Sequence, residues 1–279
     1  MKSFQDAVAI VTGAGSGLGR SIADYMACRG AVVVATDIAG ECIEETVRRI
    51  ADKGGRSVAL RADVTVEKEI SEVVEHTVRE YGRIDYLVNN AGVALNGEFQ
   101  DMDNHAWRKI MDVNFWGVIY GTRAVYSRMI EQGSGHIINV SSLAGLVPGG
   151  LMSGYGAAKH AVVGFTSNLR AEARQYGIRV TALCPGYLET PMHRSAGNVS
   201  PYIAAHDAEY LSKPHSYPTP ERIIGHMMHG ILRNRSVVVS PRIQVPVWWI
   251  YRAFPGLLPR IWSTIIMRIK QRQEALLKT

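Results

Sequence analysis

The sequence predicts an α/β protein with a doubly wound parallel sheet, and three observations lead to this prediction. Short runs of β-branched residues alternate with amphipathic helical patterns along residues 7–183. The strand runs are apolar throughout, which is typical of a parallel sheet that helices cover on both faces. A glycine-rich segment joins the first strand to the first helix. With right-handed crossovers, these features indicate a single Rossmann-type domain followed by a C-terminal helical extension.

Each element follows from its own hydrophobic pattern. Apolar runs predict strands at residues 7–12, 31–36, 58–60, 84–88, 136–140, 178–183 and 237–239, of which the third is weak. Helical spacing of apolar residues predicts helices near 18–26, 43–50, 70–78, 104–132, 154–175 and 221–234. Ligands of such sheets bind at the carboxyl ends of the strands. The residues directly after each strand are therefore the candidates for function.

The alternation of strands and helices fails after residue 183, where a long loop rich in Pro, Gly, Tyr and His begins. Loops of this length are often functional, and we expect residues 191–220 to form a substrate lid within a catalytic domain of residues 1–241. Its tyrosines (Tyr202, Tyr210, Tyr217) favour an apolar or ring-bearing substrate, or else pack the lid on the body. Its histidines (His193, His206, His215) lack a metal-ligand spacing, so we expect no metal.

The net charge of +6 is concentrated in residues 242–279, which hold seven basic residues and one acid, Glu274. The remainder is neutral, which argues against nucleic-acid binding by the main body. Three separate cysteines (Cys28, Cys42, Cys184) fit a reducing compartment, and we expect a cytoplasmic protein. The start of the chain does not resemble a signal peptide, and no apolar run is long enough to span a membrane.

The glycine-rich segment Thr12-Gly13-Ala14-Gly15-Ser16-Gly17-Leu18-Gly19 has the composition of a phosphate-binding loop. Glycines let the backbone approach a pyrophosphate, and the following helix offers free N–H groups to an anion. The spacing G-x-x-x-G-x-G differs from the common dinucleotide spacing, because Leu18 occupies the third glycine position. A tight turn is the alternative interpretation.

Asp37 ends the second strand and favours NAD over NADP. A carboxylate there can accept hydrogen bonds from both ribose hydroxyls and would repel a 2′-phosphate, for which Ser16 and Ile38 supply no cation. A solvated aspartate at a strand end is the alternative. Asp63 and Val64 follow the third strand and are weaker candidates for contact with the adenine.

Tyr155 and Lys159 are four residues apart and share one face of a predicted helix. A phenol titrates near pH 10, but a cation about 5 Å away at an effective dielectric constant of 20 contributes roughly 3 kcal/mol. We therefore expect a lowered phenol pKa and a role for Tyr155 in proton transfer. Ser141 and Ser142 close the preceding strand, and Asn114 lies within a predicted helix. Capping serines and a core amide are the alternatives for these three.

In this order and spacing, the motifs resemble those of the short-chain dehydrogenase/reductase family, over about residues 7–190. They are TGAGSGLG at 12–19, Asp63, NNAG at 89–92, Asn114, Ser142, YGAAK at 155–159 and PGYLET at 185–190. The resemblance implies a catalytic tetrad of Asn114, Ser142, Tyr155 and Lys159. Tyr155 would be the general acid/base, Ser142 would polarise the substrate oxygen, and Asn114 would hold a relay water.

The same resemblance implies that Lys159 lowers the phenol pKa and binds the nicotinamide ribose. The cofactor site would further comprise Gly13, Ser16, Gly17, Leu18, Gly19, Asp37, Asp63, Val64, Asn90, Ala91, Gly92, Tyr155, Pro185, Gly186, Leu188 and Thr190. The expected function is an NAD-dependent oxidoreductase acting on a secondary alcohol or ketone. An NADP-linked carbonyl reductase is one alternative, and an idle cofactor-sensing or membrane-scaffold protein is the other. The family suggests homodimers or homotetramers through the helices of 104–132 and 154–175.

Residues 242–279 predict a basic, aromatic and amphipathic extension. Apolar residues fall on one helical face with basic residues around it, a pattern typical of interfacial helices. The same pattern fits a helix packed on a partner subunit or over the pocket. We therefore keep peripheral membrane contact, subunit packing and pocket covering as alternatives, along with disorder.

Overall fold

The computed structural model describes residues 4–192, 197–198, 200 and 217–276. Seven parallel strands form one sheet in the order β3-β2-β1-β4-β6-β7-β9. They are β1 (Val8–Thr12), β2 (Val32–Asp37), β3 (Arg56–Arg61), β4 (Tyr86–Asn89), β6 (Gly135–Val140), β7 (Ile178–Pro185) and β9 (Val237–Ser240). The doubly wound parallel sheet is thus confirmed, and each predicted strand is present with shifted ends. Two short strands, β5 (Leu95–Asn96) and β8 (Gly197–Asn198), pair separately.

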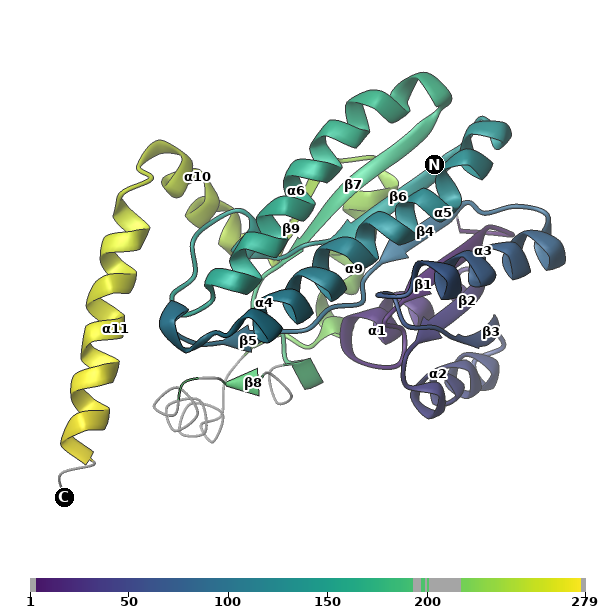
Figure 1. Ribbon diagram of the computed structural model, residues 1–279. Helices are drawn as coiled ribbons and strands as arrows, with labels where there is room; N and C mark the ends of the chain where they lie inside the picture. The colour runs from purple at the N-terminus through teal and green to yellow at the C-terminus, as the bar shows by residue number, and fades with distance from the viewer. Residues whose placement is uncertain (1–3, 193–196, 199, 201–216, 277–279) are drawn as a thin grey trace.

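Helices cover both faces of the sheet, as Figure 1 shows. One core is formed with α1 (Gly17–Ala27), α2 (Gly40–Asp52) and α9 (Pro220–Leu232), through Ile22, Ile50 and Met227. The other is formed with α3 (Glu67–Tyr81), α5 (Gly117–Gln132) and α6 (Ser153–Ala173). Within β1, Ala9 and Val11 point to the first core and Ile10 to the second. This alternation is why the strand is apolar along its whole length.

The predicted helix of residues 104–132 is divided, which corrects the sequence prediction. It begins as α4 (Asn104–Met111), passes through one π-helical segment (Asp112–Trp116) and continues as α5. The π segment contains the buried Asn114. Single-turn π segments inside helices are frequent at functional sites, and the apolar periodicity on either side conceals them.

The chain reverses its direction of winding between β1 and β4, because β2 and β3 lie on one side of β1 and the later strands on the other. Loops leaving neighbouring strands diverge at such a point and leave a crevice at the carboxyl edge of the sheet. After β9, a short 3₁₀ turn (Arg242–Gln244) leads into α10 (Val245–Ala253) and α11 (Leu257–Leu276). The division into a catalytic domain and an extension at residue 242 stays a prediction.

Candidate active site

The glycine-rich loop leaves β1 and turns directly into α1. Gly13 and Gly17 have φ values of 65° and 51°, which side chains with a Cβ rarely adopt. A Cβ on Gly19 would lie 2.1 Å from the carbonyl oxygen of Gly13, so the turn closes only with glycine there. Ser16 precedes the helix without capping it through its side chain. The first N–H groups of α1 have no partner within the helix and suit a phosphate.

Asn90 holds this loop against the end of β4. Its Nδ2 donates to the carbonyl oxygens of Thr12 and Gly13 at 2.9 and 3.1 Å. Thr12 Oγ1 in turn accepts from the backbone N–H groups of Asn90 and Ala91, each at 3.0 Å. These bonds join the two loops that border the crevice. The described contacts of Asn90 are therefore structural, and its predicted place beside the cofactor stays a prediction.

Asp37 ends β2 and faces the glycine loop. One carboxylate oxygen accepts the N–H of Gly15 at 3.0 Å, and the other accepts the N–H of Ala39 at 3.0 Å. These two bonds fix the orientation of a carboxylate that still has free lone pairs. A hydroxyl-bearing ribose suits such a fixed acceptor.

Asp63 caps the turn after β3. Its Oδ1 accepts from the backbone N–H and the hydroxyl of Thr65, at 2.9 and 2.8 Å. Val64 is buried beside Gly117, at the start of α5. The structure thus gives both residues a local packing role, and their contact with an adenine stays a prediction.

Tyr155 and Lys159 lie one turn apart on α6, both buried, with exposed fractions of 8% and 3%. The Lys159 Nζ lies 5.7 Å from the centre of the Tyr155 ring. The same nitrogen donates to the carbonyl oxygen of Val140, the last residue of β6, at 3.0 Å. The predicted pairing of a phenol with an amine at this edge of the sheet is therefore present in the geometry.

The pKa of Tyr155 differs from the sequence prediction. Burial raises the pKa of the phenol above its usual value of 10, although a hydrogen bond with Ser142 acts in the opposite direction. Burial also lowers the pKa of Lys159 from 10.5 to about 8. Both shifts favour the uncharged form, because desolvation penalises a charge. The expectation of a lowered phenol pKa neglected this desolvation, which prevails in the protein by itself.

Ser142 lies between Tyr155 and the end of β7. Its Oγ donates to the carbonyl oxygen of Pro185 at 3.4 Å and accepts the N–H of Ala144 at 3.2 Å. The hydroxyl is also near enough to Tyr155 to act against the rise in the pKa of that phenol. The hydroxyl of Ser141 points elsewhere and donates to the backbone carbonyl of Lys159 at 2.8 Å. Of the two serines, Ser142 is the one placed beside the phenol.

Asn114 faces the strand end that carries Gly92 and Val93. Its Nδ2 donates to the carbonyl oxygens of Val93 and Ile110, at 2.9 and 3.0 Å, and its Oδ1 accepts the N–H of Val93 at 3.2 Å. A Cβ on Gly92 would lie 2.8 Å from Asn114 Oδ1 and 3.5 Å from Lys159 Nζ. The glycine therefore lets the amide and the amine approach the same piece of backbone.

The segment after β7 closes the crevice. Leu188 is buried in the core beside α1, and Thr190 lies 3.5 Å from the position that a Cβ of Gly17 would take. A Cβ on Gly186 would lie 1.5 Å from Oε1 of Gln244, so the Gln244 side chain would have to move to admit it. The stretch from Pro185 to Thr190 thus passes from Ser142 to the glycine loop. The structure brings the candidate catalytic and phosphate-binding residues to one edge of the sheet.

A family model for short chain dehydrogenases matches residues 7–199. The chain belongs to the short-chain dehydrogenase/reductase family. An uncharacterized oxidoreductase of Staphylococcus saprophyticus is 40% identical over 193 residues, which cover 69% of this chain and 82% of that protein.

Two solved structures of the family share the fold. A short-chain dehydrogenase/reductase of Burkholderia phymatum in complex with NAD is 25% identical, with a TM-score of 0.84, and the match covers 92% of this chain and 97% of that one. An actinorhodin polyketide ketoreductase with NADPH is 27% identical, with a TM-score of 0.74, covering 86% and 97%. These comparisons support the family assignment and a nicotinamide cofactor. They agree equally well with NAD and with NADP.

One residue near the expected ribose site was missed by the sequence interpretation, which found no cation there. Arg20 of α1 donates to the carbonyl oxygen of Gly15, to Thr46 Oγ1 at 3.0 Å and to both carboxylate oxygens of Glu45. Arg20 lies four residues after Ser16, one helical turn into α1. This spacing is the signal in the sequence that could have identified it as a cation near the loop. Glu45 and Thr46 hold this guanidinium on α2.

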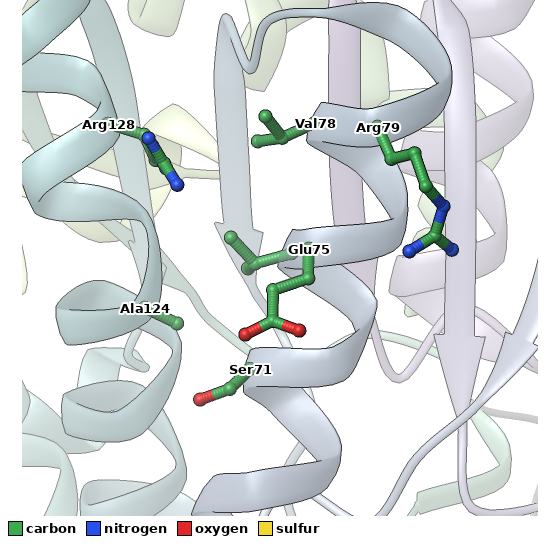
Figure 2. A pocket seen from close by; sticks show the side chains of 7 residues that line it. Ser71, Glu75, Val78, Arg79, Ala124 and Arg128 are labelled. Atoms are coloured by element: carbon green, nitrogen blue, oxygen red, sulfur yellow. The ribbon is translucent and has the colours of Figure 1, made fainter.

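A hollow in the surface lies away from the carboxyl edge of the sheet. It has a volume of about 360 Å³ and lies between α3 and α5. Figure 2 shows Ser71, Glu75 and Arg79 from α3, with Ala124 and Arg128 from α5. No candidate catalytic residue lines it, so this hollow is separate from the active site.

The predicted lid residues Tyr202, Tyr210, His193, His206 and His215 lie outside the described residues.

Proposed function

We propose that this short-chain dehydrogenase interconverts a secondary alcohol and the corresponding ketone with NAD as its cofactor. The observation that carries the proposal is the placement of Ser142 beside the buried Tyr155 and Lys159, at the sheet edge that also holds the glycine loop. A nicotinamide cofactor supplies the hydride acceptor for such chemistry. The residues of the chain bind the cofactor, orient the substrate and exchange the proton.

Tyr155 serves as the proton acceptor for the alcohol and as the donor for the ketone. Burial keeps the phenol protonated in the protein alone, which suits donation to a carbonyl oxygen. For the reverse direction, the positive charges of the Lys159 ammonium and of an oxidised nicotinamide would favour the phenolate. Ser142 donates its hydroxyl hydrogen to the substrate oxygen and holds that oxygen beside the phenol.

Asp37 and Arg20 support the choice of NAD. The fixed carboxylate of Asp37 accepts ribose hydroxyls and repels a 2′-phosphate. Arg20 does not offset this repulsion, because Glu45 binds its guanidinium in a two-pronged ion pair with a distance of 2.9 Å. The loop residues from Gly13 to Gly19, together with Pro185–Thr190, would enclose the pyrophosphate and the carboxamide.

The surroundings of the site support an apolar or ring-bearing substrate. The ring of Tyr187, which precedes the lid segment, stacks on that of Tyr217, near the end of the segment, at 5.5 Å between centroids. A groove of about 540 Å³ runs between α11 and the loop of residues 148–151, and Pro148, Trp262 and Ile266 line it. This loop immediately precedes α6, so the groove lies beside the element that carries Tyr155.

We further propose a homodimer or homotetramer through α5 and α6. The Trp116 and Tyr120 rings stack at 6.0 Å on the surface where the π segment meets α5, and Trp116 is exposed. Exposed aromatic pairs are typical of contact surfaces.

The direct test of the activity is the absorbance of reduced nicotinamide. The purified protein is mixed with NAD or NADP and a panel of secondary alcohols that differ in ring content and chain length. We expect NAD reduction with apolar members of the panel and a much lower rate with NADP. No turnover with any alcohol, and none with the matching ketones and reduced cofactor, would contradict the proposal.

A further inference from the structure

The last two helices, α10 and α11, carry an apolar surface that no described part of the chain covers. Figure 1 shows both helices on one side of the body, with α11 running along its edge. The exposed apolar side chains of the two helices and their junction include Trp249, Ile250, Phe254, Leu257, Ile261 and Ile265. Trp249 and Phe254 expose 59% and 65% of their surface. We call this set the outer face.

One side of α11 is fixed to the body, which orients the exposed residues of this helix. Trp262 donates its indole N–H to the carbonyl oxygen of Pro148 at 3.0 Å. Its ring lies 2.6 Å from the position that a Cβ of Gly150 would take. Lys270 forms an ion pair with Glu98. The residues at positions 258, 262 and 266 thus face the body, whereas those at 257, 261 and 265 lie about 100° around the helix from them and are exposed.

Arginines accompany the outer face without acidic partners. Arg252, Arg260 and Arg268 are exposed, and no carboxylate of a described residue lies within 4.0 Å of their guanidinium groups. Arg252 lies over the rings of Trp248 and Trp249, at 5.8 and 5.9 Å from their centres. Residues 242–279 contain the single acid Glu274, so the surroundings of this face are strongly positive.

The geometry points to an anionic membrane surface as the partner of the outer face. Leucine, isoleucine and tryptophan side chains on one face of a helix, with arginines beside them, match the interfacial region of a bilayer. Anionic head groups supply the negative partners that the three arginines lack among the described residues. Of the helices in the described parts of the chain, none has the length and hydropathy of a membrane span, so the contact would be peripheral.

A second copy of the chain suits this face less well. A two-fold interface places the same patch on both partners. It would bring two sets of unpaired arginines together around a shared apolar centre, and such like-charge juxtaposition is unfavourable. An anionic lipid surface buries the same apolar side chains and attracts the same charges.

Docking in this way would place the groove between α11 and residues 148–151 beside the bilayer. This groove uses the side of the same helix that faces the body, through Trp262 and Ile266. An apolar substrate dissolved in the lipid would then be close to a groove that borders the start of α6, the helix that carries Tyr155. This consequence rests on the proposed function, whereas the docking itself does not.

The test is co-sedimentation of the full chain, without substrate, with vesicles of phosphatidylcholine alone or mixed with phosphatidylglycerol. We expect binding to the mixed vesicles at low salt, weakened at high salt because exposed charges are screened. The double variant Arg260→Gln/Arg268→Gln should bind about 30-fold more weakly, since each arginine near an anionic surface contributes roughly fivefold. Ile261→Gln/Ile265→Gln should also lose binding while retaining the wild-type circular dichroism.

The matched control is Arg48→Gln/Arg79→Gln, which removes the same charge from exposed positions of α2 and α3. Retained binding of the control, together with loss in the Arg260/Arg268 variant, supports docking through the outer face. Equal loss in both variants, or no preference for anionic vesicles at low salt, overturns it. An oligomer that dissociates in Ile261→Gln/Ile265→Gln, without any vesicle binding by the wild type, assigns the face to a second copy instead.

Discussion

The hydroxyl of Ser141 donates to the backbone carbonyl oxygen of Lys159 at 2.8 Å, so two neighbouring serines at the end of β6 have separate tasks. Ser141 fixes the turn of α6 that carries the lysine. Ser142 lies beside the Tyr155 hydroxyl and donates to the carbonyl oxygen of Pro185. The pair is a natural internal comparison, because the substitution to alanine is the same at both positions.

We expect Ser142→Ala to lower kcat/KM about 100-fold or more, since it removes a donor to the substrate oxygen. The free energy of unfolding should change little, because Ser142 is only partly buried. Ser141→Ala should instead lower the free energy of unfolding by about 1 kcal/mol through the lost buried hydrogen bond. Steady-state kinetics and urea unfolding of both variants check this. Equal kinetic losses in the two variants would contradict the assignment.

Asn114 links the π segment to the strand end beside Lys159. We expect Asn114→Ala to lower the free energy of unfolding by about 2–3 kcal/mol, because three hydrogen bonds to Val93 and Ile110 are lost. Turnover should fall as well, because Gly92 and Val93 lose their support. Asn168→Ala, at an exposed position of α6, is the control and should change stability by no more than about 0.5 kcal/mol. A similar small change in Asn114→Ala would contradict a structural role for its amide.

Asp37 provides a test of cofactor preference. We expect Asp37→Ala to weaken NAD binding and to bring the kcat/KM values for NAD and NADP closer by about tenfold or more, because the repulsion of a 2′-phosphate is lost. The measurement is the ratio of kcat/KM values for the two cofactors in wild type and variant. Asp52→Ala, at the far end of α2, is the control. An unchanged ratio would remove Asp37 from the choice of cofactor.

Lys159 predicts an unusual dependence of stability on pH. Its pKa is about 8 in the fold and 10.5 as the ordinary value, so the unfolded chain binds one more proton between these pH values. The free energy of unfolding should therefore rise with pH across this window, by about 3 kcal/mol from this group. Below pH 8 the lysine is charged in both states, and the full cost of burying the charge applies.

The measurement for Lys159 is urea unfolding of wild type and Lys159→Met at pH 8 and pH 10.5. Other titrating groups contribute to both proteins, so the difference between the two isolates the lysine. We expect the wild type to gain stability relative to the variant as the pH rises. A difference that is constant with pH would contradict the burial of this amine in its uncharged form.

The strands and the main helices could be predicted from the sequence because their patterns are local. Continuous apolar runs such as residues 31–36 identify strands buried on two faces, and the glycine loop identifies the turn into α1. The position of Tyr155 and Lys159 on one helix face follows from their spacing alone. These features need no knowledge of distant parts of the chain.

The remaining features depend on contacts between distant segments. The π segment around Asn114 leaves the apolar periodicity of α4 and α5 unchanged, so a single long helix was the natural prediction. The ion pair of Arg20 with Glu45 joins α1 to α2 across 25 positions. The raised pKa of Tyr155 reflects burial by several elements, whereas the pairwise argument considered only Lys159.

The central claim is that the Tyr155 hydroxyl exchanges the proton of the reaction. The measurement is kcat of Tyr155→Phe with the best alcohol of the panel, alongside the affinity for reduced cofactor from fluorescence titration, with Tyr25→Phe as the control. We predict that kcat falls by at least about 100-fold in Tyr155→Phe, since general acid–base catalysis contributes this much, while cofactor affinity and the kcat of Tyr25→Phe stay near wild type. A Tyr155→Phe variant that retains wild-type kcat would contradict the account.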